Sequence, residues 1–232
     1  MKKIVVAIDG PAGSGKSSVS SQVAQRLGIK YIDSGALYRS ITWFILDKHH
    51  KIPAENIFLK DLEDIKMQQF FNPDASIQSY VNGQEISSLI RDEKITKNIK
   101  LVCDAKEVRD FVNDNLRKWS KQESIIMDGR DIGSVVFPQA DLKIYLDASL
   151  GVRAARRASE YLLMGKKVDK EAIKEQIKIR DNQYQTRKYG ALQKLPEAIY
   201  LDTSDLDFEQ VISQVIRLVE GILAKIKEDK KN

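Results

Sequence analysis

The sequence lacks the features of a secreted or membrane-inserted protein. Cys103 is the single cysteine, so no disulfide can form within the chain, and this pattern is typical of a reducing compartment. The first apolar run extends only from Ile4 to Ile8, which is too short for a signal peptide, and no run reaches the ~18 residues that cross a bilayer. We therefore expect a cytoplasmic protein without a membrane partner.

Long blocks of one charge and catalytic histidines are also scarce. The formal net charge is +5, but Lys and Arg alternate with Asp and Glu until the tail KIKEDKKN, and no basic stripe with interleaved aromatic residues is present. We expect no nucleic acid partner, although a nucleotide-dependent nucleic-acid-binding protein stays as a less favoured alternative. The two histidines, His49 and His50, lie between lysines on an expected exposed turn, so we assign them no catalytic work.

The chain does contain apolar runs that alternate with helical patterns. Such runs, bounded by turn residues, predict strands buried on both faces of a parallel sheet, and the alternation predicts an α/β fold. The predicted strands are 4–8, 31–32, 124–127, 142–146 and 199–201, and the predicted helices are 17–26, 36–47, 108–119, 150–164 and 211–226. A different pattern at 74–86, DASIQSYVNGQEI, alternates polar and apolar residues around Asn82-Gly83 and predicts a small antiparallel hairpin.

A phosphate-binding loop follows the first strand. Residues 10–17 read GPAGSGKS, which matches G-x-x-x-x-G-K-S between a strand and a helix. The loop N–H groups and the helix N-terminus favour phosphate, Lys16 can reach the β- and γ-phosphates, and the Ser17 hydroxyl suits Mg²⁺. Asp128 ends the strand SIIMD, where an acid near the metal is expected.

The other motifs in the sequence limit the class of nucleotide-binding protein to which this loop can belong. A switch GTPase needs an N-K-x-D motif, which the sequence lacks, and the additional segments of a motor ATPase are not recognisable. A small kinase instead holds a second phosphorylated molecule with arginines, because guanidinium groups match phosphate geometry. The chain offers several arginines for this purpose, so we favour a small kinase.

An ordered set of motifs resembles the bacterial cytidylate kinase family, within the P-loop nucleoside-monophosphate kinases. The set comprises GPAGSGKSS (10–18), YIDSGALYRS (31–40), LIRD (89–92), VR (108–109), DGRDIGSVVFPQADLKIYLDAS (128–149), RAARR (153–157), RDNQYQTR (180–187) and LDTS (201–204). The implied fold is α/β, a three-layer P-loop kinase core with a parallel sheet, a helical lid and a small antiparallel insertion for the acceptor nucleotide. We expect one domain over 1–232, with the acceptor insertion at about 62–100 and the lid at about 155–187.

The resemblance implies transfer of the γ-phosphoryl group of ATP to CMP or dCMP, with Mg²⁺, in pyrimidine metabolism, by a monomer. The acid and the arginine of the pair Asp131 and Arg109 resemble the cytosine readers, and Arg157 is expected to face the ATP phosphates from the lid. For Arg153 and Arg156 we weigh a solvated basic face equally. The implied catalytic residues are Lys16, Arg157, Arg180 and Arg187; those for ATP are Gly10, Pro11, Ala12, Gly13, Ser14, Gly15, Lys16, Ser17 and Ser18; those for the acceptor are Ser34, Tyr38, Arg39, Arg109, Arg130, Asp131, Arg180, Tyr184 and Arg187; those for the metal are Ser17 and Asp128.

Three positions depart from the family pattern. Tyr184 stands where an aspartate is expected to hold the ribose hydroxyls, Lys100 where a serine near the cytosine is customary, and Ala191 where a proline follows the lid. These departures bear on the choice between ribose and deoxyribose acceptors, on base selectivity and on catalytic efficiency, and we expect a weaker preference for CMP over dCMP than the family pattern implies. The alternatives that remain are a kinase for UMP, AMP or a non-nucleotide such as shikimate, and a kinase fold without turnover.

Overall fold

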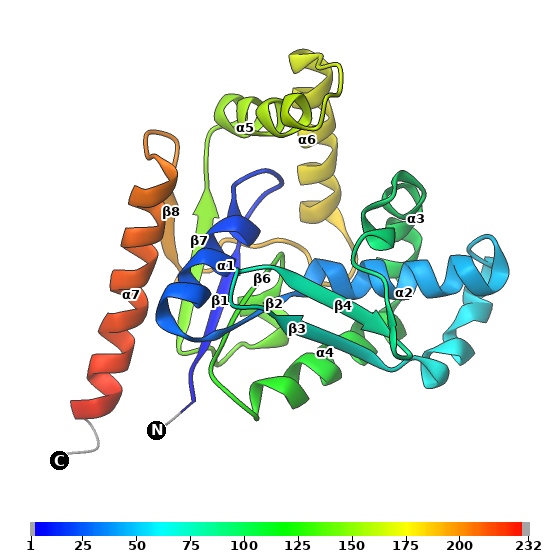
Figure 1. The fold of residues 1–232 in the computed structure, drawn as a ribbon, viewed down its shortest axis with the longest axis horizontal. Coiled ribbons are helices and arrows are strands. Elements are labelled where there is room, and N and C mark those ends of the chain that lie inside the picture. The colour runs from blue at the N-terminus through cyan, green and yellow to red at the C-terminus, as the bar shows by residue number, and fades with distance from the viewer. Residues whose placement is uncertain (1–2, 229–232) are drawn as a thin grey trace.

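The computed structural model describes residues 3–228, and its centre is a five-stranded parallel sheet. The strand order is β2-β6-β1-β7-β8, as Figure 1 shows. The strands are β1 (Val5–Asp9), β2 (Lys30–Asp33), β6 (Ile125–Gly129), β7 (Leu142–Asp147) and β8 (Ile199–Asp202). The five predicted strands are confirmed. Because β1 lies in the middle, the loop after it opens at the sheet edge where ligands bind in open α/β folds.

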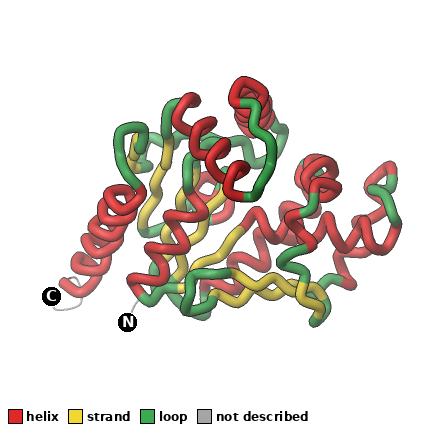
Figure 2. Tube along the Cα trace, turned by 45° about the horizontal axis from the view of Figure 1, so that its top comes forward, coloured by secondary structure: helices red, strands yellow, loops and turns green. Residues whose placement is uncertain are grey.

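Helices cover both faces of this sheet, which explains why its strands are apolar throughout. Val6 and Ile8 belong to one buried core and Ala7 belongs to the other, as the alternation of side chains along a strand requires. Figure 2 shows helices on both sides of the strands. The helices are α1 (Lys16–Leu27) and α7 (Phe208–Glu228) on the first face, and α2 (Ser34–His49) and α4 (Lys106–Ser120) on the second.

A second sheet forms the insertion, with the antiparallel order β3-β4-β5 (Figure 1). Asn82 and Gly83 have φ of 51° and 82°, so both turn residues are left-handed, as a tight hairpin turn requires. The predicted hairpin is confirmed. Its strands are β3 (Met67–Phe71), β4 (Ile77–Val81) and β5 (Gln84–Glu85), and the short helices η1 (Ala54–Asp64) and η2 (Leu89–Arg91) and the helix α3 (Glu93–Cys103) flank it.

Two helices, α5 (Leu150–Leu163) and α6 (Lys170–Thr186), rise above the carboxyl ends of the strands (Figure 1). They share a small apolar core with Ala12 of the phosphate loop, separate from the two cores of the sheet. The connection from β7 to β8 is therefore helical and packs against the phosphate loop, in the place where the sequence predicts a lid. Among residues 3–228, no helix has the length and apolar character to cross a membrane.

Candidate active site

The loop between β1 and α1 has the backbone of a phosphate-binding loop. Gly10 has φ +153°, and a Cβ added there would lie 2.0 Å from the carbonyl oxygen of Leu146, so a larger residue would collide with β7. The loop ends at Gly15, the N-cap of α1. The first N–H groups of a helix have no partner within the helix and carry a partial positive charge, so they bind anions well. Residues 10–18 thus form one continuous anion-binding segment.

Lys16 is buried against this loop. Its ammonium donates to the carbonyl oxygen of Pro11 at 2.6 Å and to Ser14 Oγ at 3.1 Å. Burial, and then the charge of Arg130, lowers the pKa of Lys16 well below its ordinary value. Both hydrogen-bond partners are neutral oxygen atoms, so phosphate oxygens at the loop would be stronger partners for this ammonium.

Asp128 and Ser17 are the predicted metal-binding pair, and the structure brings them together. The carboxylate of Asp128 accepts a hydrogen bond from Ser17 Oγ at 2.9 Å and another from the Tyr31 hydroxyl. Burial, and then the charge of Asp33, raises the pKa of Asp128, although the hydrogen bond from Tyr31 and the charge of Lys16 act to lower it. A hydroxyl and a carboxylate fit Mg²⁺, which takes few protein ligands and keeps waters and phosphate oxygens. Within residues 3–228, no cluster of three or more His, Cys, Asp or Glu could hold a metal.

The lid reaches the phosphate loop through α5 and α6. The Arg153 guanidinium donates to the carbonyl oxygen of Ala12 at 2.9 Å and to Asp181 at 2.6 Å, and Asp181 accepts from the Ala12 N–H at 2.9 Å. Arg156 donates to Thr203 at 3.0 and 2.7 Å. Arg153 is 7 % exposed, so of the two alternatives weighed for this residue the solvated face is wrong. No feature of the sequence distinguishes Asp181 beyond its place after Arg180.

Arg157, predicted to face the ATP phosphates, makes other contacts in this structure. Its guanidinium donates to Glu160 at 2.7 Å and lies 4.7 Å from the ring centroid of Tyr161. Arg156 and Arg157 come three and four residues after Arg153, and both spacings place side chains on one face of a helix. The sequence alone therefore does not show which of the two lies on the same side as Arg153, toward the phosphate loop. In this structure Arg153 contacts the phosphate loop at Ala12, and Arg156 contacts Thr203, which follows β8.

Arg109 and Asp131, the predicted cytosine readers, form a buried ion pair. Their side chains are 3 % and 7 % exposed, and the guanidinium also lies 5.4 Å from the ring centroid of Tyr38. Beside them, Ser34 Oγ donates to the carbonyl oxygen of Asp128 at 2.6 Å. A carboxylate next to a guanidinium presents both an acceptor and donors to a planar polar ring.

Asp9 positions this pair, and sequence reasoning missed it. Its carboxylate accepts the N–H groups of Ile132 at 2.9 Å and Gly133 at 2.7 Å, at the start of the π-helix η3 (Ile132–Val136) that follows Asp131. Burial raises the pKa of Asp9 to about 6 in spite of these hydrogen bonds. One feature of the sequence could have identified Asp9: it is an acidic residue at the end of an apolar strand, directly before the glycine-rich loop.

Gly190 lies directly against the same ion pair. Its φ is +62°, and a Cβ there would lie 2.0 Å from Arg109 Nη2 and 2.4 Å from Asp131 Oδ2. We expect Gly190→Ala to push the pair apart, raise KM for the acceptor about tenfold, and lower the free energy of unfolding by about 1–3 kcal/mol. Steady-state kinetics and urea unfolding check this.

The matched control is Gly165→Ala in the lid. Gly165 has φ +71°, so alanine incurs a similar backbone strain, but nothing lies within 4 Å of the added Cβ. Equal effects of the two substitutions on acceptor KM would contradict the steric explanation, because only the backbone strain is common to both.

Three arginines predicted for the acceptor phosphate gather around Tyr184. The distances from the guanidinium carbon to the ring centroid are 4.4 Å for Arg130, 5.1 Å for Arg187 and 5.8 Å for Arg180. Arg39 of α2 is close enough for its charge to interact with Arg180 and Tyr184, and burial is the main cause of its lowered pKa. The structure thus brings together side chains from α2, the loop after β6, and α6.

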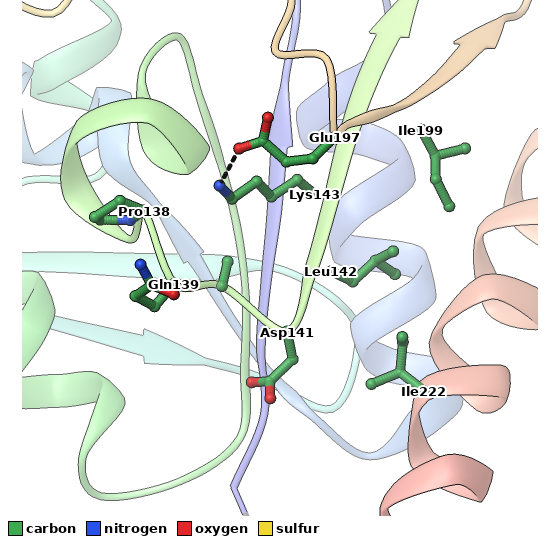
Figure 3. Close-up of a pocket in the computed structure, with 9 residues that line it drawn as sticks. Pro138, Gln139, Asp141, Leu142, Lys143, Glu197, Ile199 and Ile222 are labelled. Atoms are coloured by element: carbon green, nitrogen blue, oxygen red, sulfur yellow. Dashed lines mark hydrogen bonds and ion pairs between the residues drawn. The ribbon is translucent and has the colours of Figure 1, made fainter.

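A separate hollow of about 530 Å³ lies at the end of the sheet opposite to the phosphate loop (Figure 3). It is lined around the start of β7, where Lys143 and Glu197 pair at 2.6 Å. Because β1 and β7 are parallel, the start of β7 and the phosphate loop are at opposite ends of the strands. This hollow is therefore not part of the site described above.

Comparisons with known proteins agree on one family. The family model described as cytidylate kinase matches residues 6–221. A cytidylate kinase of Exiguobacterium sibiricum is 37 % identical over 226 residues, covering 96 % of this chain and 100 % of the relative. A cytidylate kinase of Fusobacterium nucleatum is 39 % identical over 225 residues, with 96 % and 100 % covered.

A solved structure supports the fold at a lower level of similarity. An uncharacterized protein from Eubacterium ventriosum superposes with a TM-score of 0.53, at 14 % identity, over 95 % of this chain and 99 % of the other. At this identity the likeness concerns the fold alone.

Proposed function

The chain belongs to the cytidylate kinase family, and from that premise we propose the roles of its residues in phosphoryl transfer from ATP to CMP or dCMP. The products are ADP and CDP or dCDP. One observation carries this assignment of roles: two kinds of site lie close together. The first is the glycine loop with Lys16, and the second is the buried Arg109–Asp131 pair. Arginines without a carboxylate partner lie beside that pair, and the charge of one of them, Arg130, acts on Lys16.

At the donor end, we assign the ATP phosphates to residues 10–18. The loop N–H groups and Lys16 would hold the β- and γ-phosphates, and Ser17 and Asp128 would hold Mg²⁺. When bound, Mg²⁺ offsets the negative charge on the phosphate oxygens. Arg153 and Asp181 join the lid to Ala12, so lid position and loop position are linked.

At the acceptor end, Asp131 would accept from the exocyclic amine of cytosine and Arg109 would donate to the ring acceptors. Arg39, Arg130, Arg180 and Arg187 would hold the acceptor phosphate. An oxygen of that phosphate attacks the γ-phosphorus, and the bond from this phosphorus to the bridging oxygen of ADP breaks. Because the attacking oxygen is already an anion, alignment and positive charge supply the catalysis and no general base is needed.

We further assign the acceptor insertion to residues 62–100 and the moving lid to 155–187. A phosphoryl transfer site must exclude water, and a lid that closes over both substrates does this. The separate small core of α5 and α6 supports movement of this pair as a unit. Location in the cytoplasm and a monomeric state stay predictions.

A panel of CMP, dCMP, UMP and AMP with ATP and Mg²⁺ tests the acceptor assignment. We expect kcat/KM for CMP to exceed that for UMP and AMP by well over tenfold, because both cytosine readers lose partners with the other bases. The CMP advantage over dCMP should stay below about tenfold, since Tyr184 has no carboxylate that could accept hydrogen bonds from the ribose hydroxyls.

Tyr184→Asp is the variant that restores the acid, and it should increase the preference for CMP over dCMP. A large CMP advantage in the unchanged protein would contradict the role given to Tyr184. UMP, AMP or a non-nucleotide as the best acceptor would contradict the role given to Asp131 and Arg109.

A further inference from the structure

Tyr184 is enclosed by positive charge to an unusual degree. Its ring faces the guanidinium groups of Arg130, Arg180 and Arg187 at 4.4–5.8 Å, and its hydroxyl accepts a hydrogen bond from Arg180 Nη2 at 2.9 Å. The negative face of an aromatic ring attracts a guanidinium placed over it at such distances. Tyr184 is therefore the group that now holds this arginine cluster together.

The positive charges of this cluster are not balanced by ion pairs with carboxylates of the described residues. In the part of the chain that the structure describes, no ion pair joins Arg39, Arg130, Arg180 or Arg187 to a carboxylate. The buried Nε atoms of Arg130 and Arg187 also have no hydrogen-bond partner. Buried donors without partners are costly, so these two atoms indicate a ligand with several acceptor oxygens, such as a phosphate.

We propose that Tyr184 is an internal substitute for the acceptor phosphate: it occupies the arginine cluster in the free enzyme and leaves it when the acceptor binds. The proposal rests on the proposed function, because it takes CMP phosphate as the ligand of this cluster. It makes Tyr184 a positioning residue that competes with the acceptor.

The main chain allows this exchange without unfolding of the lid. Tyr184 lies in the last turn of α6, and its carbonyl oxygen accepts from the N–H of Leu192 at 2.8 Å. Leu192 is buried, so the backbone at Tyr184 is anchored. Rotation of the side chain alone would free the guanidinium groups.

The competition should depend on pH. Burial acts to raise the pKa of Tyr184, but the charges of Arg130 and Arg180 outweigh it and lower the pKa to about 8. Arg39 and Arg187 add positive charge from α2 and from the segment after α6. Above pH 8 the phenolate binds the cluster more strongly than the phenol. Once displaced, the side chain returns toward its ordinary pKa near 10 and takes up a proton from water, so acceptor binding weakens as pH rises.

The test compares KM for CMP at pH 7 and pH 9 in the unchanged enzyme and in Tyr184→Phe, which removes only the hydroxyl. At one pH unit above the pKa, only about one enzyme in ten still has the protonated Tyr184, which the acceptor displaces more easily than the phenolate, so KM in the unchanged enzyme should rise about tenfold. Tyr184→Phe should show little change between the two pH values and should bind CMP more tightly at pH 9. Tyr200→Phe on β8, an exposed tyrosine, is the matched control and should behave as the unchanged enzyme.

Phenolate absorbance gives a readout independent of turnover. At pH 9, addition of CMP should remove the absorbance of one phenolate in the unchanged enzyme and in Tyr200→Phe, and of none in Tyr184→Phe. A KM for CMP that rises on Tyr184→Phe at pH 7, or equal pH dependence in all three proteins, would overturn the proposal and make Tyr184 a direct ligand or a bystander. Failure of the proposed function would look different, because none of the three proteins would phosphorylate CMP at either pH.

Discussion

Lys16→Met is expected to lower kcat by about 10²- to 10³-fold, because the variant loses a positive charge aimed at the transferring phosphoryl group. Methionine has a similar length, so the side chain can still fill the space below the loop. The carbonyl oxygen of Pro11 keeps a hydrogen bond from Ser14 Oγ, which limits the cost of losing the ammonium. Steady-state kinetics with saturating ATP and CMP measure the effect.

Stability should change little in this variant. Burial lowers the pKa of Lys16, which means that the folded protein holds this ammonium at a cost that methionine removes. Lys143→Met is the matched control: it is a partly buried lysine that pairs with Glu197 at the far edge of the sheet, and its kcat should be unchanged. Normal kcat in Lys16→Met would show that this loop does not hold the donor phosphates.

Asp131→Asn is expected to affect both stability and acceptor choice. The substitution leaves the Arg109 guanidinium buried without its countercharge, and removal of one partner from a buried ion pair typically costs about 3–5 kcal/mol. The asparagine amide can also donate to the O4 atom of uracil, where the carboxylate could only accept. Urea unfolding should show the loss of stability, and the ratio of kcat/KM for CMP to that for UMP should fall by more than about tenfold.

A control on α4, the helix that carries Arg109, separates the effect of charge from the effect of burial. Asp110→Asn breaks the ion pair between Lys106 and Asp110, whose side chains are 58 % and 56 % exposed, and exposed pairs contribute about 0–1 kcal/mol. Unchanged stability and unchanged CMP selectivity in Asp131→Asn would rule out its role as a cytosine reader.

Much of the fold follows from the sequence because its determinants are local. The apolar runs at 4–8 and 142–146 can only be buried on both faces of a sheet, and Asn82-Gly83 takes the left-handed turn that a hairpin needs. Helix α6 was not predicted because its pattern, KEAIKEQIKIRDNQYQT, is largely charged and buries only Ile173 and Ile177. Strand β3 was missed because it buries Gln69, which donates to the carbonyl oxygen of Asp33 in β2.

The site residues could be predicted where a motif fixes both residue type and spacing. Prediction was less successful where several residues of the same type lie near one another and the tertiary fold decides which of them reaches the site. Residues 10–17 identify their own chemistry, whereas the choice between Arg153, Arg156 and Arg157 depends on how α5 lies over the loop. Gly190 and Asp9 act on the Arg109–Asp131 pair from distant parts of the chain. Their importance depends on contacts that no local pattern encodes.

The two ends of the lid segment meet at one place on the sheet. Beyond the pairing of β7 with β8, the N–H of Ser149 donates to Ser204 Oγ at 2.8 Å, and the N–H of Thr203 donates to the carbonyl oxygen of Asp147 at 2.9 Å. Residues 150–198 therefore form an excursion from the sheet, and the chain on either side of it is joined at residues 147–149 and 202–204. Insertions or deletions in the turn between α5 and α6, away from the site residues, would add mainly a closure entropy that grows slowly with length, so this turn can vary in size over evolution while the strand register stays fixed.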